Sequence, residues 1–226
     1  YIIFTVNNIC DLMNCGTQKA VRLLKELDVK TGIGLIEKKR LGLGKPNVIY
    51  DRKNTAFSEV SIDDFPEEMY RSTRCFHTTG ITLALGQKTR ETAIEMSKRF
   101  KENGTLISFD VKFRANLWTG QEAKECIEQI LPYVDVFFCS EDTARLTFGK
   151  EGTVQDMMRS FTKDYPISVV AATQRVVHSP KIHSFGSCIY DAIADRFVQE
   201  PAYENIDVVD RIGSGDAYIS GALYGL

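Results

Sequence analysis

A short glycine-rich motif near residue 216 has the residue types needed to bind an anion and to move a proton. Gly213-Ser214-Gly215-Asp216 stands just before the helical pattern of residues 218–226. Glycines at a helix start let backbone N–H groups approach an anion, and the helix N-terminus adds positive potential. A carboxylate there can accept the proton of a hydroxyl group that attacks phosphorus. The motif predicts phosphoryl transfer, although a helix cap with an acidic first turn has the same pattern.

A second set of charged residues lies directly after the apolar residues 105–109. Asp110, Lys112 and Arg114 alternate along the chain at this point. Alternate residues at the end of a strand point the same way, so the three side chains are expected to converge on a polar ligand. A solvated loop between a strand and a helix is the alternative interpretation.

Two smaller groups of polar residues are less specific. Tyr50 and Arg52 belong to a charged stretch after an expected strand, where a solvated loop would have the same composition. His77, His178 and His183 do not have the spacing of metal ligands, so ordinary surface or core roles are expected for them. No cluster of side chains is therefore predicted to hold a metal directly.

The elements that would position these groups alternate between apolar runs and amphipathic segments from residue 51 onward. Strands are expected over residues 74–77, 105–109, 134–139 and 167–172, and helices over residues 89–102, 121–131, 141–148 and 154–163. Alternating strands and helices predict a parallel sheet that is covered by helices on both faces. Ligands of such sheets bind beyond the carboxyl ends of the strands. A hairpin over residues 185–190 and 196–200 interrupts the alternation.

The first 50 residues have a different pattern, that of a basic helix-turn-helix. Helices are expected over residues 6–13 and 17–27, and two strands over residues 34–40 and 47–50 form a hairpin. Polar and basic residues that could reach DNA are Gln18, Lys19 and Arg22 on the second helix and Lys38, Lys39, Arg40 and Lys45 on the hairpin. Such cations would contact phosphates while the helix reads the major groove. A small helical hairpin with a charged surface is the alternative.

Composition sets the broad class of protein and separates the two parts. The 226 residues are 43% hydrophobic and 26% charged, as in ordinary globular proteins, and no apolar run is long enough for a membrane span. Six cysteines without a Cys-x-x-Cys motif indicate reduced thiols and a cytoplasmic location. The net charge of −2 divides into +4 for residues 1–50 and −6 for the remainder. The two parts are therefore expected to have different partners.

Residues 1–50 resemble a known DNA-binding domain. The stretch YIIFTVNNICDLMNCGTQKAVRLLKELDVKTGIGLIEKKRLGLGKPNVIY is similar to the winged-helix domain at the start of the replication initiator A proteins of Gram-positive plasmids. The resemblance implies a winged helix that binds DNA. That family's domain begins with at least one more helix, so residues 1–50 are expected to form a partial domain.

Residues from about 50 to 226 resemble the PfkB/ribokinase sugar kinases, and 2-keto-3-deoxygluconate kinases in particular. The resemblance rests on YDRKNTAFS, HTTGITLALG, SFDVKFRANLW, VFFCSEDTARLTFG and DVVDRIGSGDA, in the family's order and spacing. It implies a ribokinase-like, mostly parallel sheet with helices on both faces. It also implies ATP-dependent phosphorylation of a sugar-acid hydroxyl with Mg²⁺, so that a small sugar acid and ATP are the expected partners.

The resemblance assigns roles to particular residues. Asp216 would be the catalytic base, and Gly213, Ser214 and Gly215 would form the anion hole. Substrate contacts would come from Tyr50, Arg52, Asp110 and Arg114, the last of which would bind the carboxylate of the sugar acid with both of its oxygens. Asp210, Glu141 and Arg175 would lie near the nucleotide or its metal.

Three departures from the family pattern affect the nucleotide and phosphate region. Lys112 stands where the family usually has Asn. Ser140-Glu141-Asp142-Thr143 stands at the family's Asn-x-x-Glu motif, and neither end matches. Residues 173–175 and 178–183 stand where many relatives have a short Lys-x-Gly turn.

The resemblance to the sugar kinases also covers only a middle part of the family's sequence pattern. Relatives have their first strands and β lid before it and continue beyond it, so a sheet that is incomplete at both ends is expected. Its open edge would favour aggregation or a partner, including a homo-oligomer. Two domains are predicted, residues 1–50 and 51–226. Three functions stay open: a sugar-acid kinase, a DNA-binding module, and a fusion fragment without a joint function.

Overall fold

The computed structural model describes residues 18, 19, 22, 36–40, 46–50, 55–209 and 212–226. The chain divides into two compact units, Tyr1–Ser61 and Ile62–Leu226, and each is considered by itself. Within the described residues, no helix is long and apolar enough to cross a membrane.

The first unit contains an antiparallel hairpin. Strand β1 (Ile36–Arg40) pairs with β2 (Pro46–Tyr50), with Ile36 opposite Tyr50 and Arg40 opposite Pro46. These strands confirm the predicted hairpin. The short 3₁₀ helix η1 (Ala56–Glu59) follows it. Of the predicted helices over residues 6–13 and 17–27, only residues 18, 19 and 22 are described, and these three are helical.

The second unit is built on a mixed sheet. Its strands are β3 (Cys75–Thr79), β4 (Leu106–Asp110), β5 (Val136–Phe138), β6 (Val169–Val177), β7 (Ile182–Asp191), β8 (Arg196–Gln199) and β9 (Tyr203–Asp207). The order is β3-β4-β5-β6-β7-β8, and β9 also pairs with β7. The pairings from β3 to β6 are parallel, as predicted, whereas β7 pairs with β6, β8 and β9 in the antiparallel sense. Short connections join β6 to β7 and β7 to β8, and sheet neighbours joined by a short connection are antiparallel.

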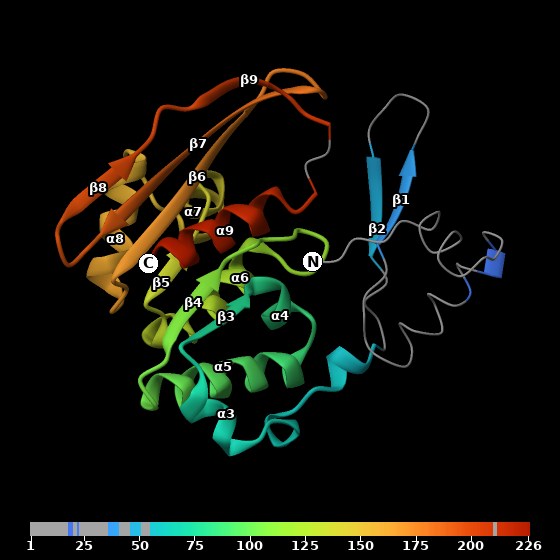
Figure 1. The fold of residues 1–226 in the computed structure, drawn as a ribbon, viewed down its shortest axis with the longest axis vertical. Helices are drawn as coiled ribbons and strands as arrows, with labels where there is room; N and C mark the ends of the chain where they lie inside the picture. The colour runs from blue at the N-terminus through green and yellow to red at the C-terminus, as the bar shows by residue number, and fades with distance from the viewer. Residues whose placement is uncertain (1–17, 20–21, 23–35, 41–45, 51–54, 210–211) are drawn as a thin grey trace. The chain divides into compact units, whose positions relative to one another are not determined.

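Helices lie on both faces of this sheet, as predicted (Figure 1). They are α3 (Glu67–Ser72), α4 (Gly80–Ala84), α5 (Gln87–Glu102), α6 (Gly120–Ile127), α7 (Glu141–Phe148), α8 (Val154–Asp164) and α9 (Ser214–Gly225), with 3₁₀ helices η2 (Ile62–Asp64) and η3 (Leu131–Tyr133). Helices α3 to α8 contribute to one large apolar cluster. Helix α9 covers the other face, where Ile219 packs with Val136, Phe138 and Ala171.

The strand residues divide between the two faces by simple alternation. Phe137 belongs to the large cluster, whereas its neighbours Val136 and Phe138 belong to the α9 cluster. In the same way, Val170 faces α8 and Ala171 faces α9. Burial on both faces explains why these strands are continuously apolar in the sequence.

Several element boundaries differ from the sequence-based expectations. The helix expected over residues 121–131 ends at Ile127 and continues as the tighter η3. Strand β6 extends beyond the expected end at residue 172 to Val177, so residues 173–175 also belong to a strand. Strand β7 pairs with all nine residues of β6, including those of the extension. Helices α3 and α4 and strand β9 were not predicted, because they are too short to show a periodic pattern.

Candidate functional site

The loop after β4 is held in an unusual conformation. Lys112 has a φ of 41°, which lies in the left-handed region, and its N–H donates to Asp110 Oδ1 at 3.3 Å. A Cβ atom added to Gly80, at the start of α4, would lie 2.1 Å from the carbonyl oxygen of Val111. Because only glycine permits this close approach, Gly80 fixes the path of the chain between Asp110 and Lys112.

Helix α9 presents an open N-terminus at the motif found in the sequence. Gly213 precedes the helix with a φ of 80°, and the helix has no side-chain cap. A Cβ atom added to Gly213 or Gly215 would meet no other atom within 4 Å. The backbone of the first turn is therefore accessible to an anion, which the helix terminus favours electrostatically. Asp216 lies in this first turn.

The loop after β4 and the start of α9 meet through an ion pair. Lys112 Nζ contacts Asp216 Oδ1 across 104 positions of sequence. The two side chains are 23% and 29% exposed, so solvent reaches the pair only in part. We refer to Asp110, Lys112, Asp216 and the adjoining residues 213–215 as the Asp216 site.

Burial and charge shift the pKa values of two groups here. Burial raises the pKa of Asp110 to about 6, although the charge and N–H of Lys112 oppose the shift, and Asp216 raises it further. Arg114 also lowers the pKa of Asp110, which places its guanidinium within electrostatic range. Burial, and then the charge of Lys112, lower the pKa of His77, while Asp216 raises it. The Nδ1 atom of His77 lies 2.9 Å from Ser108 Oγ.

Arg114 does not join the ion pair. Its Nη1 donates to the carbonyl oxygen of Phe113 at 2.8 Å, and the residue is half-buried. The structure therefore brings Asp110 and Lys112 together, whereas Arg114 bonds to the backbone beside it.

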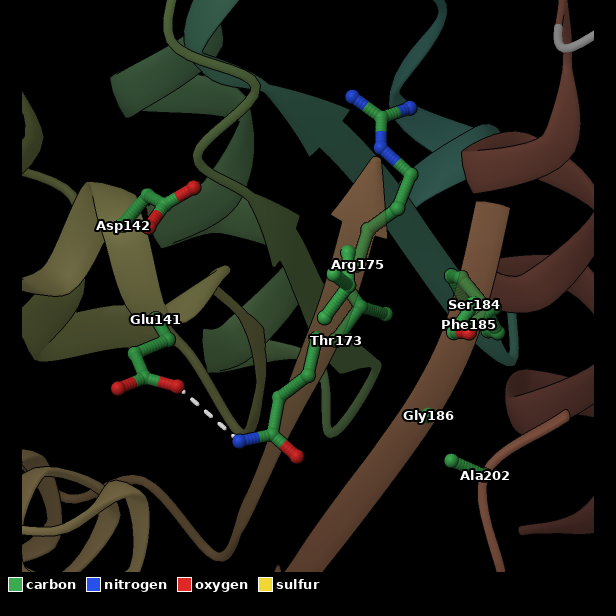
Figure 2. A pocket seen from close by; sticks show the side chains of 10 residues that line it. Glu141, Asp142, Thr173, Arg175, Ser184, Phe185, Gly186 and Ala202 are labelled. Atoms are coloured by element: carbon green, nitrogen blue, oxygen red, sulfur yellow. Dashed lines mark hydrogen bonds between the residues drawn. The ribbon is translucent and has the colours of Figure 1, made fainter. Parts of the chain in front are cut away.

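A pocket of about 290 Å³ lies where α7 begins, and we call it the Glu141 pocket (Figure 2). Its lining includes Glu141, Asp142, Thr173, Gln174, Arg175 and Gly186. Gln174 Nε2 donates to Glu141 Oε2 at 3.0 Å, and Arg145 Nη2 donates to Glu141 Oε1 at 2.9 Å. These two hydrogen bonds lower the pKa of Glu141, so the pocket contains an ionised carboxylate.

Arg175 and Gln174 point to different sides of β6. Figure 2 shows that Arg175 extends away from Glu141. Gln174 shares a face with the buried Ala172, while Arg175 shares a face with Ala171, which packs under α9. Gln174, which was not among the predicted site residues, is therefore the strand residue that contacts Glu141.

Aromatic contacts connect the Glu141 pocket with the Asp216 site. Tyr218, two residues after Asp216, packs against Phe138 and Phe185 with ring centroids 6.2 and 6.0 Å apart. Phe138 ends β5, and Phe185 lines the pocket. Both sites therefore lie toward the carboxyl ends of the parallel strands, where ligands of such sheets bind.

The remaining predicted site residues are only partly described. Asp210, Arg52 and Lys45 lie outside the described residues. Tyr50 ends β2, and Lys38, Lys39 and Arg40 belong to β1. Gln18, Lys19 and Arg22 are helical and exposed. In the part of the chain that is described, no group of three or more His, Cys, Asp or Glu side chains is arranged to hold a metal ion.

The fold and the open helix start define an α/β protein of the ribokinase-like class. A PfkB family carbohydrate kinase from Listeria grayi is 30% identical, with a TM-score of 0.74 over 92% of this chain and 68% of that one. The 2-dehydro-3-deoxygluconokinase from Thermotoga maritima is 28% identical, with a TM-score of 0.75 over 93% of this chain and 69% of that one. The chain belongs to the PfkB family of carbohydrate kinases.

Two further comparisons qualify the match. The 2-dehydro-3-deoxygalactonokinase of Haloferax volcanii is 30% identical over 177 residues, which are 78% of this chain and 52% of that protein. The chain thus spans about half the length of the curated relatives it matches. Residues 1–63 match a different family model, described as the N-terminus of replication initiator protein A.

Proposed function

We propose that this protein transfers the γ-phosphoryl group of ATP to a hydroxyl group of a sugar acid, namely 2-keto-3-deoxygluconate. The observation that carries the proposal is the position of Asp216 in the first turn of α9, next to the open backbone at Gly213 and Gly215. A proton acceptor and an anion-binding helix start are the two groups that phosphoryl transfer to a hydroxyl requires. Named relatives that act on 2-keto-3-deoxy sugar acids support the choice of substrate.

In this mechanism Asp216 and residues 213–215 act on the reacting groups, and Arg114 binds the substrate. Asp216 accepts the proton of the attacking hydroxyl. The N–H groups of residues 213–215 bind the negative charge that is present on the transferring phosphoryl group. Arg114 binds the carboxylate of the sugar acid, because a guanidinium can donate to both carboxylate oxygens.

The Glu141 pocket fits the nucleotide. Gly186 lines the pocket with backbone alone, and a Cβ atom added there would lie 3.4 Å from Ala202 Cβ. Glu141 and Asp142 supply carboxylate oxygens, the ligand type that Mg²⁺ prefers, directly or through water. Mg²⁺ bound with ATP would neutralise charge on the phosphates. Arg175 would contribute a further cation for the phosphates.

A coupled assay of ADP release tests the proposal. The full chain is incubated with ATP, Mg²⁺ and 2-keto-3-deoxygluconate, beside the Asp216→Ala variant. The substitution should reduce turnover roughly 10²- to 10⁴-fold, the usual contribution of a general base. Unchanged turnover in a folded Asp216→Ala protein would contradict the role of Asp216.

The match of residues 1–63 to the replication initiator model favours a second candidate function, DNA binding by the first unit. If four cations neutralise phosphates, log affinity should fall with log salt concentration with a slope of roughly −3.6. Fluorescence anisotropy with a labelled duplex at several salt concentrations measures this slope. A flat response would show that the basic residues serve only as a solvated surface.

A further inference from the structure

The Lys112–Asp216 ion pair is the feature of the site that the proposed function does not yet use. Lys112 stands where the family pattern has Asn, and an asparagine side chain carries no charge. The backbone of Lys112 is also in the left-handed conformation, which is unfavourable for a residue with a side chain. Such local strain tends to occur at functional positions.

The Lys112 ammonium lies among acidic groups whose negative charge it can offset. Asp110 and Asp216 face it from β4 and α9, and His77 on β3 lies within range of its charge. In the protein without ligand, the ammonium offsets two neighbouring carboxyl groups. Arrival of a phosphate would add more negative charge beside Asp216, and a carboxylate and a phosphate repel each other unless a cation lies between them.

We propose that Lys112 is a catalytic residue that bridges Asp216 and the γ-phosphate of ATP. The inference rests on the proposed function and adds a phosphate contact to the same site. An ammonium has three N–H donors, so one can remain on Asp216 Oδ1 while another donates to a phosphate oxygen. The bridge would hold the proton acceptor beside the phosphorus atom and offset the charge of the transferring group. No bond of Lys112 is made or broken in this role.

Binding of nucleotides separates this role from a structural one. Calorimetry with ATP and with ADP, each without sugar acid, is applied to the full chain and to Lys112→Met. The parent protein should bind ATP more tightly than ADP. Lys112→Met should lose ATP affinity about tenfold while its ADP affinity stays within threefold, because ADP lacks the γ-phosphate. Lys112→Arg should restore part of the difference.

Lys101→Met is the matched control. Lys101 forms a similarly close ion pair with Asp135, the residue before β5, at the other end of the sheet. Its loss should leave the ATP-to-ADP preference unchanged. NMR titration of His77 reports on the ion pair itself. In the parent protein the charge of Lys112 lowers the pKa of His77, so this pKa should rise in Lys112→Met.

The kinetic expectation for Lys112→Met is a kcat roughly 100-fold lower, with KM for the sugar acid within threefold. Equal ATP affinities for the parent and Lys112→Met, with the His77 pKa raised, would overturn the bridge and leave the kinase proposal standing. ATP selectivity that depends on Lys112, without turnover of 2-keto-3-deoxygluconate, would support the bridge and overturn the proposed substrate. No ATP binding by the parent protein would overturn both.

Discussion

The Asp216 site and the Glu141 pocket lie toward the same end of the sheet, but the pKa values of their carboxyl groups are shifted in opposite directions. Burial raises the pKa of Asp110 in the first, whereas hydrogen bonds from Gln174 and Arg145 lower the pKa of Glu141 in the second. A carboxylate whose hydrogen-bond donors are already in place is suited to bind and position a ligand. A site in which carboxyl groups share one cation is suited to chemistry, because small changes in charge alter its protonation.

The backbone supports the same distinction. The Asp216 site depends on a left-handed Lys112 and on a glycine pressed against a carbonyl oxygen. The Glu141 pocket is formed by a regular hairpin and by a helix that Ser140 caps in the ordinary way. Substitutions should therefore damage the first region more than the second, and each prediction below tests part of that contrast.

The largest effect is expected for Gly80→Ala. The new Cβ would lie 2.1 Å from the carbonyl oxygen of Val111, so the loop that carries Lys112 must move. The free energy of unfolding should fall by about 3 kcal/mol, the upper part of the usual range for overpacking, and turnover should fall with it. Urea titration and the ADP-release assay measure the two. Gly221→Ala, which adds a methyl group in open space on α9, is the control and should be neutral or slightly stabilising.

Asp110→Asn tests the raised pKa through the pH dependence of stability. The folded protein binds the Asp110 proton more tightly than the unfolded chain, whose carboxyl has an ordinary pKa near 3.8. The contribution of Asp110 to stability should therefore fall as pH rises from 3.8 to about 6, and stay constant above that. The difference in unfolding free energy between the parent protein and Asp110→Asn measures this term. A difference that grows with pH would mean that Lys112 outweighs burial.

Glu141→Gln should affect nucleotide binding and leave the chemical step unchanged. The substitution removes the charge that Gln174 and Arg145 now stabilise. KM for ATP with Mg²⁺ should rise about tenfold, the value of one charge-assisted hydrogen bond, with kcat within threefold. Glu151→Gln changes an exposed carboxylate beyond α7 and is the control. A kcat that falls as far as in Asp216→Ala would erase the contrast between the two regions.

The smallest effects are expected from two helix caps. Ser140 Oγ accepts from Thr143 N at 3.3 Å at the start of α7, and Thr153 Oγ1 accepts from Asp156 N at 3.2 Å at the start of α8. Replacing either with Ala should cost about 1 kcal/mol of stability, measured by thermal unfolding. Only Ser140→Ala should also raise KM for ATP, because Ser140 precedes Glu141. Equal KM values in both variants would show that the start of α7 does not position Glu141.

The local parts of the fold and site could be predicted from the sequence. Residues 141–148 and 154–163 are amphipathic over at least two turns, so both helices are found close to their true ends. The glycine motif before Asp216 is contiguous, so a short stretch of sequence is enough to predict that it lies at a helix start.

The parts that depend on long-range pairing could not be predicted. Residues 173–177 pair with β7, and this long-range pairing extends the strand beyond its expected end at residue 172. An expected strand that stops at residue 172 does not show that residues 174 and 175 face opposite sides of the sheet, so Gln174 is not among the predicted site residues. The Lys112–Asp216 pair joins two motifs that no local spacing relates, and only the packing of α9 on the sheet brings them together.

Phosphorus NMR of the reaction products tests the central claim most directly. The full chain is incubated with ATP, Mg²⁺ and 2-keto-3-deoxygluconate, and the spectrum is compared with that of Asp216→Asn. The account predicts that ADP and a new phosphomonoester form in equal amounts, and that both are lost in the variant. ADP accompanied by inorganic phosphate, or a phosphomonoester that persists without the Asp216 carboxylate, would contradict it.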